Sequence, residues 1–195
     1  MFSMSSFKNS NFVKCIDNFL DKESFVGLQN TVLNATPYVH AMGKDKKPYG
    51  YEHVLFVDHF KNDPLVKQVK NKLFPNEDFK PVEMRFHLRH NQGEPHPHRD
   101  GDFDGDEDFF AFLLYVKGER LLYNGTGFYN YEKELSTYVG FVENRAIFFN
   151  AGKIFHTDLQ TLGKSSWRYS MNIFFQPPWH PGDILPTGGG KSTKS

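Results

Sequence analysis

Hydrophobic and polar positions alternate with a period of two along much of the chain after residue 53. Between Val82 and Leu88 every second residue is apolar, which is typical of a β-strand with one buried face. From Phe109 to Val116 all eight residues are apolar, as in a strand that is buried on both faces. Turn signals such as Asn124-Gly125 separate these runs. Many short strands, with little helix after residue 75, predict a closed or two-sheet β architecture.

The last predicted strand has two unlike faces. Between Trp167 and Phe175 one face is apolar, whereas Arg168, Ser170 and Asn172 form the other. A polar face on a strand in an aromatic-rich part of the chain indicates a lined cavity.

A short strand or turn followed by one amphipathic helix is predicted for residues 16–34. Apolar residues recur there at helical spacing, as at Phe25, Leu28 and Val32, and Asp21 stands where the helical stretch begins. We expect this helix to pack against the outside of the β structure.

Length and charge narrow the class of protein. The chain of 195 residues matches one domain, predicted over residues 1–178, and we expect the Gly/Lys/Ser/Thr-rich tail, 179–195, to be flexible. Lys and Arg together number 23, as do Asp and Glu, so the basic surplus of a nucleic-acid scaffold is missing. No apolar run reaches the roughly 20 residues of a membrane span. With the single Cys15, this predicts a soluble, cytoplasmic protein without a membrane partner.

The densest chemical signal is the stretch around His98 and Asp100. In an extended chain, residues two apart point to the same side, so this pair can present an imidazole nitrogen and a carboxylate oxygen to one metal ion. His156, which follows a short apolar run, is the leading candidate for a third ligand. Two histidines and one carboxylate leave coordination positions open, as in the non-haem Fe(II) oxygenases.

Arg168 and Ser170 supply a second signal, twelve and fourteen residues after His156. A guanidinium at the bottom of a cavity binds a carboxylate through two hydrogen bonds, and a nearby hydroxyl completes the clamp. The matching ligand is a dicarboxylate. If its other end is a 2-oxo acid, that end would chelate the metal through two of the open positions. The residue set therefore predicts a cosubstrate as well as a metal.

From about residue 14 to 176 the chain resembles the Fe(II)/2-oxoglutarate-dependent dioxygenases, and within them the prolyl 4-hydroxylase-like branch. The segments that carry the resemblance are Ile16 to Leu20, His98-Arg99-Asp100, Phe109 to Val116, Asn144 to Phe149 before His156, and Trp167 to Ser170. The branch often has a tyrosine three residues before the glycine that precedes the metal pair, as a cosubstrate contact. His90 stands at that position before Gly93 and is the candidate here.

The resemblance implies a mainly β fold, the double-stranded β-helix or jelly-roll barrel, with one or more N-terminal helices packed outside it. It implies Fe(II) as the metal and 2-oxoglutarate as the cosubstrate, and it leaves ascorbate open as a further cofactor. The implied reaction hydroxylates an aliphatic carbon of a peptidyl residue or a small molecule and releases succinate and CO2. Halogenating relatives lose the acidic ligand, so the presence of Asp100 favours hydroxylation.

Three other interpretations stay open at this point. A cupin-type oxygenase that does not use 2-oxoglutarate would take His96 as a ligand and be indifferent to Arg168. A non-catalytic β-barrel would use the histidines to bind a structural zinc ion or would bind no metal with them.

The acidic run 100–108 starts like a calcium loop but has Ala111 where the bidentate glutamate belongs. It is more consistent with a solvated acidic loop, with a preference for cationic substrates as a further hypothesis.

The substrate would be selected by segments that close over the metal, here residues 37–52 and 120–138. Five tyrosines are candidates to line this mouth or to pack beneath it: Tyr38, Tyr49, Tyr51, Tyr123 and Tyr129. A peptidyl residue or a small molecule is expected as the partner.

Overall fold

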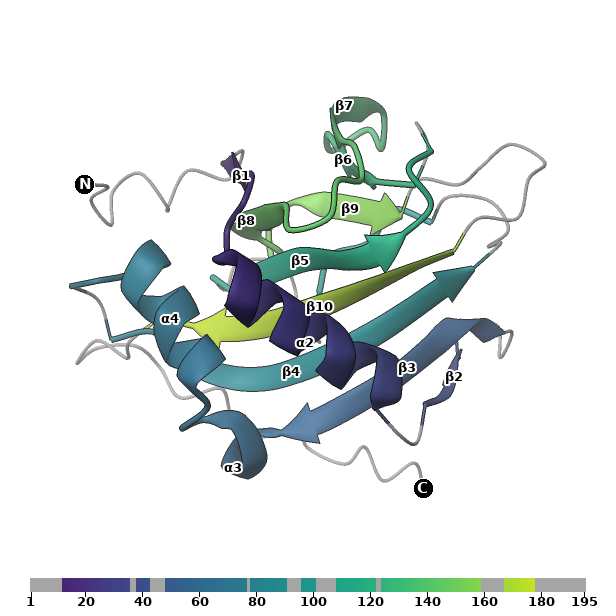
Figure 1. The fold of residues 1–195 in the computed structure, drawn as a ribbon. Helices are drawn as coiled ribbons and strands as arrows, with labels where there is room; N and C mark the ends of the chain where they lie inside the picture. The colour runs from purple at the N-terminus through teal and green to yellow at the C-terminus, as the bar shows by residue number, and fades with distance from the viewer. Residues whose placement is uncertain are drawn as a thin grey trace, which may run out of the picture.

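Two antiparallel sheets and three helices make up the described part of the chain in this computed structural model (Figure 1). The described residues are 12–35, 38–42, 48–76, 78–90, 96–100, 108–121, 124–158 and 167–177. Within these ranges only the backbone is described at 40–42, 48–50, 56–58 and 90. The predicted tail, 179–195, and the acidic residues 101–107 lie outside the described ranges.

The larger sheet has seven strands, all paired antiparallel. In spatial order they are β1 (Val13–Ile16), β8 (Ala146–Asn150), β5 (Phe110–Gly118), β10 (Trp167–Gln176), β4 (Lys80–His90), β3 (Pro48–Phe56) and β2 (Val39–Met42). β5 lies in the middle of this sheet, and its alternate residues pack in two different apolar clusters, one on each face. The uninterrupted apolar run from 109 to 116 is therefore buried on both faces, as predicted.

The smaller sheet has three strands, β7 (Leu135–Val139), β6 (Thr126–Tyr129) and β9 (Phe155–Asp158). An isolated antiparallel bridge between His98 and His156 adds the 96–100 segment beside β9. From β5 onward the chain passes from the large sheet to the small one and back, twice. This is the winding of a double-stranded β-helix, so the predicted fold class is confirmed.

The helices α2 (Lys22–Asn34), α3 (Val57–Phe60) and α4 (Pro64–Leu73) lie on the outer side of the large sheet (Figure 1). Asp21 caps α2 by accepting a hydrogen bond from the Ser24 amide at 2.9 Å, and Leu28 and Val32 are buried. The helix predicted to pack outside is thus confirmed, whereas α4 has no counterpart among the predicted elements. None of the described helices is long and apolar enough to cross a membrane.

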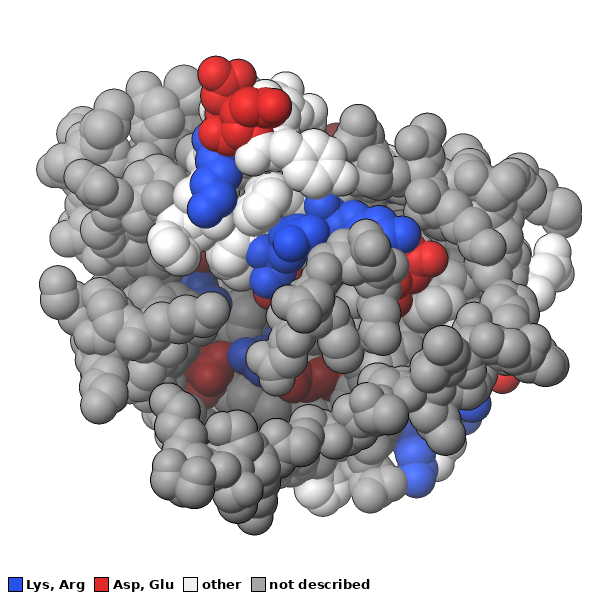
Figure 2. Space-filling model, turned by 180° about the vertical axis from the view of Figure 1, so that it is seen from behind, with Lys and Arg blue, Asp and Glu red and all other residues white. Residues whose placement is uncertain are grey.

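Alternation along the central strands separates two apolar clusters. On β5, Phe112 and Leu114 face the helices together with Met171, whereas Leu113 and Tyr115 face the small sheet. The interior between the two sheets holds this second cluster and a set of polar side chains. Seen from the side opposite the helices, the surface is hollowed, and acidic and basic atoms lie on the floor of the hollow (Figure 2).

Candidate active site

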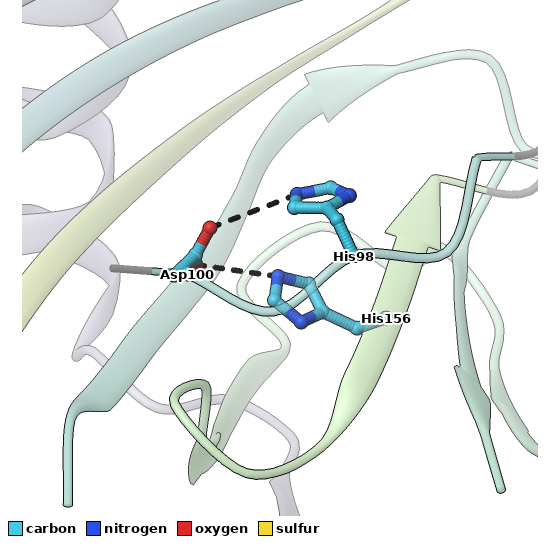
Figure 3. Close-up of side chains that lie close together, drawn as sticks. All are labelled: His98, Asp100 and His156. Carbon is cyan, nitrogen blue, oxygen red and sulfur yellow. Dashed lines mark ion pairs between the residues drawn. The ribbon is translucent and has the colours of Figure 1, made fainter. Parts of the chain in front are cut away.

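The three predicted metal ligands converge. One ligand atom from each of His98, Asp100 and His156 lies within 4.8 Å of the other two (Figure 3). Main-chain hydrogen bonds set this geometry. The amides of His98 and His156 each donate to the carbonyl of the other, at 3.1 and 2.9 Å, and the Asp100 amide donates to the Ala151 carbonyl at 2.9 Å. Residues far apart in the sequence are thus held side by side by the backbone.

Both imidazole rings are oriented through their Nδ1 atoms. His98 Nδ1 lies 3.0 Å from the His96 carbonyl oxygen, and His156 Nδ1 lies 3.1 Å from the Ile154 carbonyl oxygen. A carbonyl only accepts, so each Nδ1 carries the proton when the ring is neutral, and each Nε2 offers a lone pair. The Nε2 atoms face Asp100, at 3.6 Å from Oδ1 for His98 and 3.3 Å from Oδ2 for His156.

Electrostatics at the three ligands agree with a site for a cation. Burial opposes ionisation of Asp100, but the neighbouring His156 and His98 favour it, and the pKa of the carboxyl is lowered. Burial also opposes a charged His156, yet the Asp100 carboxylate outweighs it and the pKa of the ring is raised. Burial and the adjacent His156 lower the pKa of His98. A carboxylate beside two imidazoles is the state that binds a divalent ion.

The donor set fits a divalent transition metal such as Fe(II). Ligand atoms about 2.1 Å from an ion and at right angles to each other are about 3.0 Å apart, close to the two separations measured from Asp100. A metal-bound histidine usually donates its other ring N–H to a carbonyl or carboxylate oxygen, as the two Nδ1 atoms do here. His96 is exposed and is not part of the metal-ligand group found among the described residues. This arrangement gives no support to the cupin interpretation.

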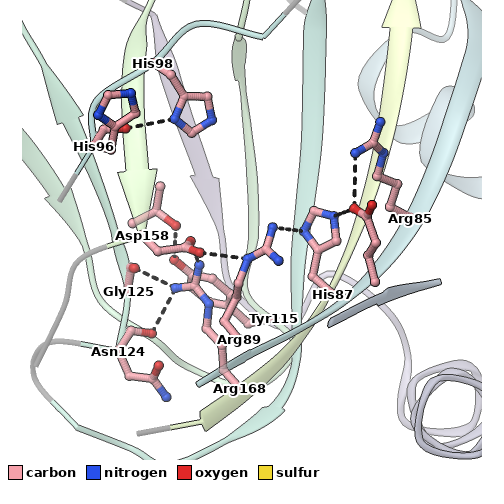
Figure 4. Close-up of polar contacts among 12 residues, drawn as sticks. Arg85, His87, Arg89, His96, His98, Tyr115, Asn124, Gly125, Asp158 and Arg168 are labelled. Carbon is pink, nitrogen blue, oxygen red and sulfur yellow. Dashed lines mark hydrogen bonds and ion pairs between the residues drawn. The ribbon is translucent and has the colours of Figure 1, made fainter. Parts of the chain in front are cut away.

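Arg168 lies in the interior, with 2% of its surface exposed, and burial lowers the pKa of its guanidinium. Its Nη1 donates to the carbonyl oxygens of Asn124 at 3.2 Å and Gly125 at 2.5 Å. Its Nη2 donates to Asp158 Oδ1 (Figure 4). Its buried Nε has no hydrogen-bond partner among the described residues. The guanidinium also lies over the Tyr115 ring, 5.1 Å from its centroid.

The other predicted cosubstrate contacts differ in their placement. Ser170 is buried on the same strand as Arg168, with 1% of its surface exposed, and is paired in register with His87 on β4 and with Tyr115 on β5. His90 pairs in register with Trp167 at the end of β4, and its side chain lies outside the described part of the structure.

The polar residues of β4 extend the site. Arg89 Nε donates to Asp158 Oδ2 at 3.1 Å, and Arg89 Nη2 donates to His87 Nδ1 at 3.2 Å. His87 Nε2 lies 3.8 Å from a Glu52 oxygen, which in turn accepts a hydrogen bond from Arg85 at 3.2 Å. One polar network therefore runs through the interior from Arg168 to Arg85 (Figure 4).

Apart from Arg168, the members of this network were not among the predicted site residues. Its signal in the sequence is the alternation of Glu83, Arg85, His87 and Arg89 between apolar residues, which predicts a solvent-facing side for the strand. In the structure that side faces the interior, and His87 is only 8% exposed. The polar face of β4 is therefore partly covered: His87 is buried, and Arg89 pairs with Asp158 on β9 of the small sheet, whereas Glu83, Arg85 and Arg89 are half-buried.

The tyrosines predicted at the mouth have mixed roles. Tyr38 packs with the outer apolar cluster, and its hydroxyl donates to the Val32 carbonyl at 2.6 Å, so it packs rather than lines the mouth. Tyr51 and Tyr129 are half-buried. The side chain of Tyr49 and all of Tyr123 lie outside the described residues.

Comparisons with known proteins show which solved structures have a similar fold. No family model matches the sequence, and no curated protein matches it. Among solved structures, a prolyl hydroxylase from Trichoplax adhaerens, in complex with a hypoxia inducible factor peptide fragment, has a TM-score of 0.63 at 13% identity, covering 88% of this chain and 86% of that one. A prolyl-4-hydroxylase from Pseudomonas putida has a TM-score of 0.58 at 16% identity, covering 86% and 93%. HygX from Streptomyces hygroscopicus, with nickel and 2-oxoglutarate bound, has a TM-score of 0.63 at 8% identity, covering 92% and 89%.

These likenesses show the fold. The chain is a double-stranded β-helix like those of prolyl hydroxylases and of a protein that binds nickel and 2-oxoglutarate. The resemblance stated from the sequence is therefore confirmed at the level of the fold.

Proposed function

We propose that this protein is an Fe(II)- and 2-oxoglutarate-dependent dioxygenase that hydroxylates an aliphatic carbon of a peptidyl residue or a small molecule. The observation that carries the proposal is the convergence of His98, Asp100 and His156, with both Nε2 atoms turned toward the carboxylate. The fold shared with prolyl hydroxylases supports it.

The metal would be held by the two Nε2 atoms and the Asp100 carboxylate. When bound, Fe(II) supplies the activation of dioxygen, in the overall reaction of 2-oxoglutarate, O2 and a C–H bond to give succinate, CO2 and a C–OH bond. The protein's own part is to hold the ligands, bind the two organic molecules and exclude water. Phe149 packs its ring against His156, with 4.7 Å between centroids, and keeps one side of the centre apolar.

Arg168 would bind the far carboxylate of 2-oxoglutarate. A carboxylate binds arginine most strongly when it accepts hydrogen bonds from two nitrogens along one edge. Because Nη1 donates to two main-chain carbonyls, the edge formed by Nε and Nη2 is the one available to a ligand. Ser170 lies two residues from Arg168 on β10 and is paired in register with Tyr115 on β5. The Tyr115 ring lies beside the guanidinium.

Nη2 of that edge donates a hydrogen bond to Asp158 Oδ1, and Arg89 donates one to the other oxygen of Asp158, Oδ2. Two guanidiniums therefore share this carboxylate, and the buried Nε of Arg168 has no hydrogen-bond partner among the described residues. A second carboxylate would give Arg168 a counter-charge of its own, so an incoming carboxylate is favoured here. We infer that Asp158 yields Nη2 to the cosubstrate and stays paired with Arg89.

Anaerobic titration with Fe(II) and 2-oxoglutarate tests the proposal. An oxygenase of this kind develops a visible metal-to-ligand absorption band when both are present, whereas a β-barrel that holds only a structural zinc does not. We expect the band in the wild-type protein and its loss in His156→Ala. Absence of the band and of succinate release in the wild-type protein would reject the proposal.

A further inference from the structure

We propose that the substrate carries a protonated amine, which binds to a group of side chains at the other end of the interior, called here the Glu52 cluster: Glu52, Glu83, Arg85 and His87. This inference rests on the proposed function, since it names the substrate class of the same site. It concerns the part of the interior that neither the metal nor the cosubstrate carboxylate uses.

The Glu52 cluster occupies the polar face of β3 and β4. Glu52 pairs in register with His87, and Glu83, Arg85 and His87 are alternate residues of one strand. Arg85 Nη1 donates to Glu52 Oε2 at 3.2 Å, and Arg85 Nε donates to Glu83. The Glu52 side chain is 17% exposed and that of Glu83 is 32% exposed, so both carboxylates are partly open rather than sealed.

The charges of the Glu52 cluster do not balance. Two carboxylates contact one guanidinium. His87 adds no positive charge, because its Nδ1 lies at hydrogen-bond distance from Arg89, which only donates. Burial and the three arginines Arg89, Arg85 and Arg168 also lower its pKa well below the usual value. One negative charge is left over on a partly buried surface, and a cation is the ligand that compensates it.

Two buried polar atoms point to a ligand independently of this charge. His87 is more than nine-tenths buried, and its Nε2–H, directed toward Glu52, has no hydrogen-bond partner among the described residues. Asn172 Oδ1, on the strand position paired with Arg85, is likewise buried without such a partner. A donor and an acceptor left unpaired cost free energy until a ligand meets them. An amine next to an oxygen acceptor, as in amino alcohols, amino acids and amino sugars, satisfies both.

The position of the Glu52 cluster suits a substrate rather than a distant effector. Arg89, which donates to His87, also donates to Asp158 on β9, the strand that carries the metal ligand His156. A small molecule held by its amine at Glu52 would therefore lie in the same interior as the metal centre, with its carbon chain free to extend toward it. Arg85 keeps Glu83 as a partner when Glu52 turns to the ligand, so no charge is stranded.

Ligand-observed NMR with three matched probes tests the inference. The probes are 2-amino-1-butanol, sec-butylamine, which lacks the hydroxyl, and 1-butanol, which lacks the amine. Their affinities are measured on the full chain, first without metal and then with Mn(II) and 2-oxoglutarate bound. We expect the affinity order aminobutanol, then butylamine, then butanol, with about tenfold or more between the first and the last. With Mn(II) bound, the carbon-chain protons of the amines should relax faster than those of butanol.

Glu52→Gln should remove the preference for the two amines and leave the affinity for 2-oxoglutarate unchanged. The matched control is Glu23→Gln, an exposed carboxylate on α2 on the outer side of the large sheet, which should bind all three probes like the wild type. Equal binding of butanol and butylamine, or an unchanged preference in Glu52→Gln, would overturn the inference. Failure of Mn(II) and 2-oxoglutarate to bind, with the amine preference intact, would instead reject the proposed function.

Discussion

The two ends of the interior share strand β4 and carry opposite charge. At one end Arg168 and Arg89 share Asp158, and at the other Glu52 and Glu83 share Arg85. Each end is internally paired, but guanidiniums outnumber carboxylates at the first and carboxylates outnumber guanidiniums at the second. The kind of charge in excess at each end, rather than the presence of ion pairs, indicates which ligand group that end is built to receive.

The metal centre belongs to neither end and would carry out the reaction itself, so its loss should have the largest effect. Asp100→Ala removes the carboxylate ligand, and we expect succinate formation to fall by more than about two orders of magnitude. Cosubstrate turnover followed by succinate release measures this. Asp78→Ala, an exposed carboxylate on the approach to β4, is the control and should keep full turnover. Substantial succinate formation by Asp100→Ala would contradict the assignment of this ligand.

The positive end should respond next most strongly, and only toward the cosubstrate. Arg168→Lys keeps a charge but loses the two-nitrogen edge, so we expect the Kd for 2-oxoglutarate to rise by about tenfold to a hundredfold. Anaerobic titration of the visible band measures the Kd, and thermal denaturation shows whether the variant is folded. The affinity for sec-butylamine should not change. A parallel loss of amine binding would show that the two ends do not act separately.

Most of the residues at these two ends could not be predicted from the sequence as site residues. The period of two around Phe86 and the apolar run that contains Tyr115 predict the strands, because alternation directly reflects strand geometry. His98 and Asp100 were predictable as a pair because their spacing matches one face of an extended chain. Arg89, Asp158 and Glu52 were not, since the polar face of an amphipathic strand usually faces solvent. Only the pairing of β4 with β10 beneath the small sheet turns that face inward.

A smaller effect, of opposite sign, is expected from Asp158→Asn. The carboxylate of Asp158 competes with the cosubstrate for Arg168 Nη2, and its neutralisation leaves two buried guanidiniums without their shared counter-charge. We therefore expect 2-oxoglutarate to bind about threefold to tenfold more tightly, a change of roughly 0.7 to 1.4 kcal/mol. The band titration measures it, with Asp78→Asn as the control. Weaker binding would show that Asp158 chiefly positions Arg168.

The last effect is on stability rather than on ligand binding, and it concerns the neutral state of His87, on which the negative excess of the Glu52 cluster depends. Because burial and the neighbouring Arg89, Arg85 and Arg168 lower its pKa in the folded protein, the unfolded chain binds more protons at this residue below its ordinary pKa of about 6.5. His87 therefore destabilises the fold progressively as the pH falls through that value, by up to about 1.4 kcal/mol for each pH unit. Nearby Glu52, at 3.8 Å, would favour the charged ring but does not reverse the shift.

His87→Gln removes this contribution while keeping a polar side chain. Urea unfolding of the wild type and the variant at pH 7 and pH 5 measures it, and the other histidines cancel in the difference between the two proteins. We expect the free energy of unfolding to fall by less in His87→Gln than in the wild type over this range. An equal fall in both proteins would mean that His87 takes up its proton in the fold as readily as in the unfolded chain. Below a pH of about 6.5 its charge would then offset the negative excess of the Glu52 cluster, and the preference for an amine would be lost there.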